Sequence, residues 1–209
     1  MVGGDRTVLA LRYGDMIAEL RSSAKEETMA CVGRVSGLLT AHAGAYCVVD
    51  VIGIGAGVVS RLREQFPAGA RIEAFNAAER SDAKDRSGEL GFANKRAAAW
   101  WHLRELLDPA YGAAIALPPD DTLTGDLTAP HWHVQSGGKI LIESKDDIRG
   151  RIGRSTDAGD AVVQAFAPIT KAPAVPRAFI GPPRMSAQSL SALRLGVPQP
   201  NGPIDWTKR

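Results

Sequence analysis

The residues of this chain that are best suited to chemistry are aspartates, and Asp50 is the first of them. It lies in an apolar, strand-like run at 47–52 that is followed at once by Gly53, Gly55 and Gly57. An ionised carboxylate in such a run is costly unless a cation or a hydrogen-bond donor lies against it. The pattern therefore indicates a metal site as the first hypothesis.

Asp157 and Asp160 form a second acidic feature, at the start of the apolar segment 161–167. They are three residues apart and share one face of a helix. Ser155 and Thr156 before them are good N-cap residues, and carboxylates in a first turn are favoured by the helix dipole. Two interpretations stay open: the aspartates charge the start of a helix, or they contribute metal ligands.

Other catalytic and binding motifs are weaker. The glycines after Asp50 suggest dinucleotide binding, with Glu73 as the ribose acid, but Val58 occupies the third glycine position of that fingerprint. The chain has no phosphate-binding GxxxxGK[ST] loop and no G-x-S-x-G nucleophile motif. His131 and His133 are two apart on an expected strand, where they either bind a metal or face solvent.

A locally basic segment precedes Asp157. Its cations are Lys139, Lys145, Arg149, Arg151 and Arg154, against the acids Glu143, Asp146 and Asp147. This segment is either a solvated surface or, if Asp50 and Asp160 converge, a surface that holds a phosphate backbone beside bound metals. Carboxylates are the ligands that Mg²⁺ and Mn²⁺ prefer, so the second alternative favours a two-metal-ion nuclease, in which one cation activates a water and the other stabilises the leaving oxygen.

Composition predicts one globular domain with a core. The chain has 209 residues, 44% of them hydrophobic, and a net charge of +2, which does not indicate a nucleic-acid-binding protein by bulk charge. Cys31 and Cys47 form no CxxC pair and are expected as free thiols. No leader or membrane-length apolar run is visible, so we expect a soluble, intracellular protein without a membrane partner.

The expected elements alternate between strands and helices. Residues 6–13 and 16–21 predict a hairpin, 24–43 a helix, 46–52 a strand, 57–65 a helix, 71–75 a strand, 94–107 a helix, 120–127 a short acidic helix or turn, and 131–134 and 139–143 strands of a second hairpin. Residues 77–88 are expected as an exposed loop. The order strand–helix–strand across 46–75 predicts a parallel pair in a mixed sheet.

The end of the chain has a different composition. Eight of the thirteen prolines lie at or after Pro168. Proline lacks a backbone N–H and interrupts helices and strands. We therefore expect a domain at 1–167 and an extended or disordered C-terminal arm at 168–209.

Four sequence blocks resemble the nuclease domain of the large terminase subunit of tailed bacteriophages. They are Gly3–Val8, Val49–Gly57, Glu143–Asp147 and Gly153–Ala161, and the resemblance covers roughly 3–167. It implies an α/β, ribonuclease H-like fold: a mixed β-sheet flanked by helices. It also implies a Mg²⁺- or Mn²⁺-dependent endonuclease that cuts concatemeric double-stranded viral DNA during packaging, in the cytoplasm of the bacterial host. The partners implied are the terminase ATPase domain, the small terminase subunit and the portal.

The resemblance also assigns roles to residues. Asp50 and Asp160 match metal-binding acids, Lys145 matches a lysine near the active site, Asp157 lies beside Asp160 as an auxiliary ligand, and Asp5 matches a secondary acid. We expect Asp50, Asp160 and Lys145 to be catalytic. The family's first ligand lies on a strand upstream of the Gly3–Val8 block, so this domain is expected to lack its first strand.

The expected loss of a strand leaves alternatives open. Unpaired backbone groups predict low stability or pairing with another segment. The missing ligand favours a non-catalytic docking or DNA-binding module of the packaging machinery as the alternative function. A ribonuclease H-like resolvase or another nuclease is a nearer alternative.

Overall fold

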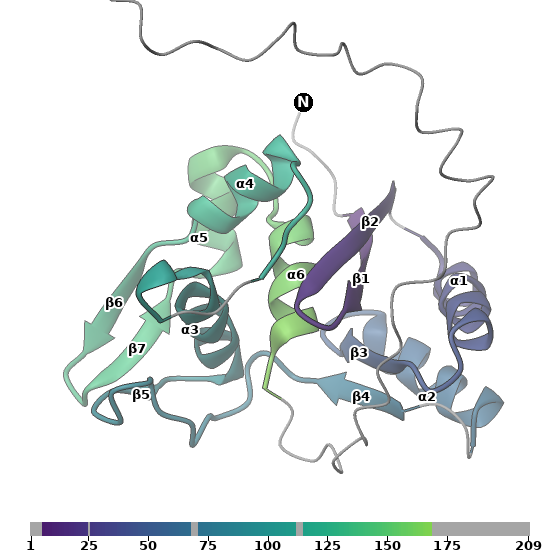
Figure 1. Ribbon diagram of the computed structural model, residues 1–209, viewed down its shortest axis with the longest axis horizontal. Coiled ribbons are helices and arrows are strands. Elements are labelled where there is room, and N and C mark those ends of the chain that lie inside the picture. The colour runs from purple at the N-terminus through teal and green to yellow at the C-terminus, as the bar shows by residue number, and fades with distance from the viewer. Residues whose placement is uncertain (1–5, 25, 68–70, 112–114, 169–209) are drawn as a thin grey trace, which may run out of the picture. The chain divides into compact units, whose positions relative to one another are not determined.

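The computed structural model describes residues 6–24, 26–67, 71–111 and 115–168, which belong to the unit Met1–Pro168. The elements, shown in Figure 1, are β1 (Arg6–Tyr13), β2 (Met16–Ala24), α1 (Thr28–Ala41), β3 (Tyr46–Asp50), α2 (Gly55–Gln65), β4 (Arg71–Phe75), β5 (Gly91–Phe92), α3 (Lys95–Leu107), the 3-10 helix η1 (Pro109–Tyr111), α4 (Asp121–Thr128), β6 (Trp132–Gln135), β7 (Lys139–Ile142), α5 (Lys145–Ile152) and α6 (Asp157–Phe166). Asp5 and, apart from Pro168, the expected C-terminal arm lie outside the described residues.

The first two strands form the expected antiparallel hairpin. Strand β1 pairs with β2 from Arg6 opposite Ala24 to Tyr13 opposite Met16. Gly14 in the turn has φ +59°, a conformation that glycine adopts without steric cost. Among the described strands, β1 pairs on one side only.

The next strands form the expected parallel pair. Strand β3 pairs with β4 from Tyr46 opposite Arg71 to Asp50 opposite Phe75, and α2 is the crossover helix between them. Helices α1 and α2 bury a small core against this pair. Its buried members are Cys31, Val32, Val35, Leu39, Val58, Val59, Leu62 and Ile72. The carboxyl end of β3 is thereby fixed at Asp50.

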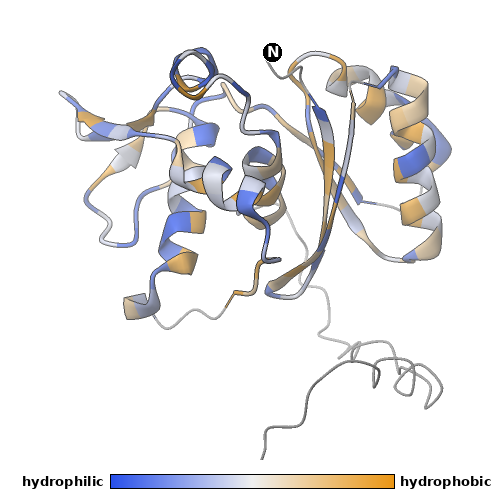
Figure 2. Ribbon diagram, turned by 90° about the horizontal axis from the view of Figure 1, so that it is seen from above, coloured by the Kyte–Doolittle hydropathy of each residue, from blue (hydrophilic) through white to orange (hydrophobic). Residues whose placement is uncertain are grey.

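A mixed three-stranded sheet lies in the other half of the domain. Strand β7 pairs parallel with β5 and antiparallel with β6. Helices α3, α4 and α6 share a second core with this sheet, which includes Trp100, Leu103, Leu123, Ile140 and Val162. In Figure 2 the helices carry both hydrophobic and hydrophilic segments, as expected for helices with one buried side.

Helix α6 packs against elements of both halves of the domain, the half with β1 to β4 and the half with the three-stranded sheet. It contacts β1 and β3 as well as α3 and α4, and Figure 1 shows it in the middle of this unit. The predicted α/β architecture of sheets flanked by helices is confirmed. Within the described residues, hydrogen bonds divide the expected mixed sheet into three small sheets, β1–β2, β3–β4 and β5–β7–β6.

Two local details differ from the expectation. The polar segment after β7 forms the helix α5, which buries Ile148. Its apolar pattern is too sparse to reveal it, because Ile148 is the one buried residue among the eight of the helix. Met29, an apolar residue of the predicted helix 24–43, is 57% exposed. No helix among the described residues is long and apolar enough to cross a membrane.

Candidate active site

Asp50 is the last residue of β3, so its side chain stands at the edge of the parallel pair. Its side chain is 24% exposed, and Oδ1 accepts a hydrogen bond from the backbone N–H of Ile52 at 3.0 Å. The backbone then turns through Gly53, which has φ +79°. A Cβ on Gly55 would lie 1.6 Å from the carbonyl oxygen of Asp50. The glycines therefore let the chain turn tightly beside this carboxylate.

Asp160 lies in the first turn of α6 and is the more buried acid, with 11% of its side chain exposed. The indole Nε1 of Trp100 on α3 donates to Oδ1 at 3.1 Å, and the Thr156 hydroxyl donates to Oδ2 at 3.4 Å. These donors hold the carboxylate in one orientation. Trp100 is a buried core residue and also a neighbour of the acidic site that the sequence did not reveal.

Lys145 brings the two acids together. Its Nζ lies 3.1 Å from Oδ2 of Asp160 and 3.7 Å from Oδ2 of Asp50. Lys145 is the first residue of α5, whose N-cap Ser144 accepts the N–H of Asp147 at 3.1 Å. Burial disfavours the ammonium, but the attraction of Asp160 and Asp50 outweighs it, so the pKa of Lys145 lies above its ordinary value.

Two further polar residues border the acidic pair. Gln164, one turn after Asp160 on α6, donates from Nε2 to Oδ2 of Asp50 at 3.3 Å. Arg96 on α3 donates from Nη1 to the backbone oxygen of Glu143 at 2.5 Å. Neither residue carried a recognisable sequence signal, because their neighbours in space are distant in the sequence.

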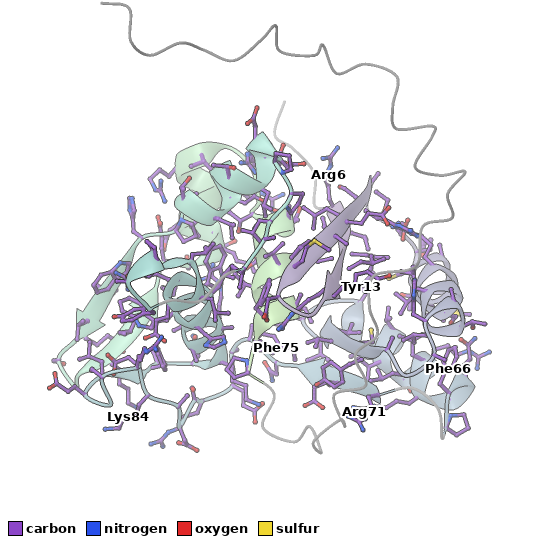
Figure 3. All side chains as sticks on the ribbon, viewed as in Figure 1. Arg6, Tyr13, Phe66, Arg71, Phe75 and Lys84 are labelled. Atoms are coloured by element: carbon purple, nitrogen blue, oxygen red, sulfur yellow. The ribbon has the colours of Figure 1, made fainter. Side chains whose placement is uncertain are left out.

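These side chains surround a cavity of about 10 Å³. Its lining residues are Asp50, Phe75, Ala77, Arg96, Ala99, Trp100, Lys145, Asp160, Val163 and Gln164. Phe75, labelled in Figure 3, comes from the end of β4 next to α6. The polar groups thus meet in a small, partly apolar space, where charges are screened less than on the surface.

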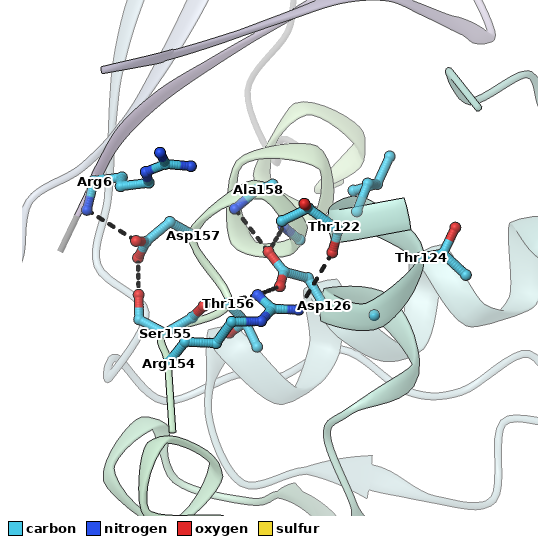
Figure 4. A network of polar contacts seen from close by, with 12 residues as sticks. Arg6, Thr122, Thr124, Asp126, Arg154, Ser155, Thr156, Asp157 and Ala158 are labelled. Carbon is cyan, nitrogen blue, oxygen red and sulfur yellow. Dashed lines mark hydrogen bonds and ion pairs between the residues drawn. The ribbon is translucent and has the colours of Figure 1, made fainter. Parts of the chain in front are cut away.

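Asp157 makes different contacts from Asp160. Its Oδ2 accepts the backbone N–H of Arg6 at 2.9 Å, and its Oδ1 accepts the Ser155 hydroxyl (Figure 4). The structure thus ties Asp157 to the start of β1, while Asp160 faces Lys145. Among the described residues, no three His, Cys, Asp or Glu side chains gather at one point.

Asp126 is a buried acid that the sequence did not single out. It is 1% exposed, and its Oδ2 accepts the backbone N–H groups of Ala158 and Gly159 at 3.0 and 3.1 Å. Arg154 pairs with its Oδ1, as Figure 4 shows. Asp126 on α4 thereby satisfies the free N–H groups at the start of α6 and fixes the turn that carries Asp160.

The expected basic surface is partly used inside the fold. Arg151 donates to both carboxylate oxygens of Glu143, at 3.2 and 2.6 Å, and Arg154 pairs with Asp126. His131 and His133 flank or lie on β6, all of whose residues are exposed. Among the described residues, Lys145 is the cation that pairs with both acids, and Arg96 lines the same cavity.

Comparison with known proteins gives matches in structure. No protein-family model and no curated protein matches the chain. The nuclease domain of the large terminase subunit gp2 of bacterial virus Sf6 aligns with a TM-score of 0.67 and 20% identity, covering 83% of this chain and 85% of that chain. A lysine-to-alanine mutant of that domain, with manganese and beta-thujaplicinol, gives 0.67 and 19%, covering 82% and 84%.

A third match is the same mutant domain with calcium, at a TM-score of 0.66 and 19% identity, covering 78% of this chain and 83% of that chain. At this identity the likeness establishes the fold. The resemblance noted in the sequence is thus confirmed at the level of architecture: this chain has the ribonuclease H-like fold of the nuclease domains of phage large terminase subunits.

Proposed function

We propose that this domain is a metal-dependent DNA endonuclease of a phage or prophage terminase, with Asp50 and Asp160 as its metal ligands. One observation carries the proposal: two acids from different elements, β3 and α6, turn their Oδ2 atoms toward the same cation, Lys145 Nζ. A place that stabilises an ammonium between two carboxylates is electrostatically suited to a divalent cation.

The donor set fits Mg²⁺ or Mn²⁺. Both ions prefer carboxylate oxygens and keep several water ligands, so two carboxylates are enough to hold one ion. A second ion would need more oxygen ligands. Asp157 and Asp5 stay proposals for this auxiliary role, with Asp157 bound to Arg6 and Ser155 in this structure and Asp5 outside the described residues.

The chain's own residues would have distinct roles in hydrolysis. A bound divalent ion supplies a water of lowered pKa and neutralises the charge of a phosphate oxygen. The carboxylates of Asp50 and Asp160 would hold the ion. The donors from Ile52 and Trp100 orient these carboxylates. The side chain of Lys145 is 48% exposed, so it can turn from the carboxylates toward a phosphate oxygen.

The biological setting is part of the same proposal. The Sf6 domains that share this fold are nuclease domains of a large terminase subunit, and one was solved with manganese. On this basis we propose concatemeric double-stranded DNA as the substrate, in the cytoplasm of the bacterial host. The partners would be a terminase ATPase domain, a small terminase subunit and the portal.

Cleavage of supercoiled plasmid tests the proposal. With Mg²⁺ or Mn²⁺ the chain should convert the plasmid to nicked or linear forms, and Asp50→Ala should lower the rate about a hundredfold or more. Asp82→Ala is the matched control, because the Asp82 side chain is 96% exposed in a loop. Metal-dependent cleavage that survives Asp50→Ala would overturn the assigned ligands.

The alternative function is a docking or DNA-binding module without catalysis. The observation that favours it is that only two acids meet at Lys145 among the described residues. The unmutated chain used for the cleavage assay also distinguishes the nuclease from the docking or DNA-binding module. DNA binding that needs no metal, together with no cutting by the unmutated chain, would support the module.

A further inference from the structure

Arg96 joins three segments that lead to the acidic pair. It is the second residue of α3, and its backbone N–H donates to the oxygen of Ala77, beyond β4, at 3.0 Å. Its Nη1 donates to the oxygen of Glu143 at 2.5 Å. Glu143 follows β7 and precedes Ser144, the N-cap of α5. Arg96 therefore holds the chain two residues before Lys145.

The guanidinium approaches the acids without pairing with them. Its Nε and Nη2 are buried and have no hydrogen-bond partner among the described residues, although Arg96 lines the same cavity as Asp50 and Asp160. An arginine in a bidentate pair with either carboxylate would occupy the oxygens that a metal needs. Here the carboxylate oxygens face the Lys145 ammonium, and their other donors, such as the Trp100 indole, are neutral.

The charges around Arg96 keep it in place. Asp160 on α6, Glu143 after β7 and Asp50 on β3 attract it, while Lys145 on α5 repels it. Burial lowers the pKa of Arg96 against these attractions, and the group still stays charged at neutral pH. Its guanidinium carbon lies 5.8 Å from the ring centre of Trp100.

We propose that Arg96 is a positioning residue that acts through Lys145: by holding the Glu143 carbonyl it fixes the start of α5, from which Lys145 reaches Asp50 and Asp160. The expected effect of Arg96 on DNA cleavage rests on the proposed function. Its expected effect on the start of α5 rests on geometry alone. Lys145 can leave the acids for a phosphate and return, because its own backbone stays fixed. A lysine on a mobile helix start would lose that alignment.

The structural consequence is tested by amide hydrogen exchange in the full chain. The Ile148 amide donates to the Ser144 oxygen at 3.0 Å and reports the first turn of α5. Arg96→Met should speed its exchange about tenfold, and Arg96→Lys, which keeps a charged donor, should stay within about threefold of the unmutated rate. Arg104→Met is the matched control, since Arg104 is on the same helix but stacks on Trp101 at 4.4 Å.

The catalytic consequence is tested by kinetics. Arg96→Met should lower kcat about tenfold and change the KM for DNA less than about twofold, and Arg96→Lys should recover most of the loss. Its effect should vanish in a Lys145→Met background, because the two residues act in series. Losses that add in the double variant would overturn the proposal, as would an unchanged Ile148 exchange rate in folded Arg96→Met.

The role of Arg96 can be decided even if the unmutated chain does not cut DNA or if the Arg96→Met variant does not fold. If the unmutated chain does not cut DNA, the proposed nuclease function fails, and the exchange measurement still decides the role of Arg96. If Arg96→Met does not fold, nuclear magnetic resonance of the Arg96 guanidinium in the unmutated chain decides. A slowly rotating, hydrogen-bonded Nη group is expected, and free rotation of that group would overturn the proposal.

Discussion

Lys145 and Asp160 lie on consecutive helices, and the Lys145 ammonium approaches Oδ2 of Asp160 to 3.1 Å. The same ammonium lies 3.7 Å from Oδ2 of Asp50, so one cation balances two acids from different parts of the fold. Two carboxylates this close to one another repel unless a positive charge separates them. The relationship explains why α5 and α6 must be set accurately against the end of β3.

Gly55 sets the position of Asp50. Gly55→Ala should lower the free energy of unfolding by about 3 kcal/mol or more, because the added Cβ would lie 1.6 Å from the Asp50 carbonyl oxygen. Gly57→Ala is the control: its nearest neighbour would be Thr28 Cγ2 at 3.4 Å, and alanine should stabilise α2 by up to about 1 kcal/mol. Urea unfolding measures both, and equal stabilities would contradict the close approach at Gly55.

Asp126 holds the start of α6. Asp126→Asn should lower the free energy of unfolding by about 2–4 kcal/mol. The substitution removes a buried charge that pairs with Arg154 and accepts the N–H groups of Ala158 and Gly159. Asp121 is an exposed acid in the first turn of α4, the helix that also carries Asp126. Asp121→Asn should lower the free energy of unfolding by less than about 1 kcal/mol. Thermal unfolding of the two variants compares them; similar losses would show that the buried contacts of Asp126 contribute little.

Glu143 should make stability depend on acid pH. Hydrogen bonds from Arg151 and from the His131 backbone lower the pKa of Glu143 to about 2. A carboxyl group whose pKa is lowered by folding stabilises the protein above its unfolded pKa, and this contribution is lost as pH falls toward the folded value. The stability gap between the unmutated chain and Glu143→Gln should therefore be constant above about pH 5 and shrink toward pH 2.

Urea unfolding of both proteins at several pH values measures that gap. Arg151→Met provides a partner control, because without the Arg151 donors most of the pH-dependent stabilisation should disappear. A gap that stays constant from pH 6 to about pH 2 would refute the assignment.

Strands β1 and β3 should show exchange that differs between their two edges. Among the described strands, β1 pairs with β2 and β3 pairs with β4, while β7 has neighbours on both sides. Amides of β1 and β3 on their unpaired edges should exchange about a hundredfold faster than those on the paired edges. Residue-level hydrogen exchange checks this, with β7 as internal control. Uniform protection along both edges of β1 and β3 would contradict it.

Much of the fold could be predicted because its elements carry strong local patterns. The hairpin around Gly14, the parallel pair β3–β4 and the helix α3 follow apolar periodicity and turn glycines. Helix α5 was missed because Ile148 is its one buried residue. Ser144 with Asp147 three residues later is the capping signal that indicates its start.

The site was predictable where acids stood out from their surroundings. Asp50 in an apolar run and Asp160 at a helix start were identified, and the structure brings both to Lys145. Arg96 and Asp126 could not be found from the sequence. Their partners are 47 and 28 residues away along the chain, and nothing in the local pattern specifies such pairing.

The central claim is that Asp50 and Asp160 bind a divalent cation, and the most direct measurement is anomalous diffraction from crystals of the chain grown with Mn²⁺. A manganese peak about 2–2.5 Å from oxygens of both carboxylates, with the Lys145 ammonium displaced, is the expected result. Asp160→Asn should remove the peak, while Asp82→Asn should leave it. Manganese absent from this pair, or bound elsewhere in the domain, would contradict the account.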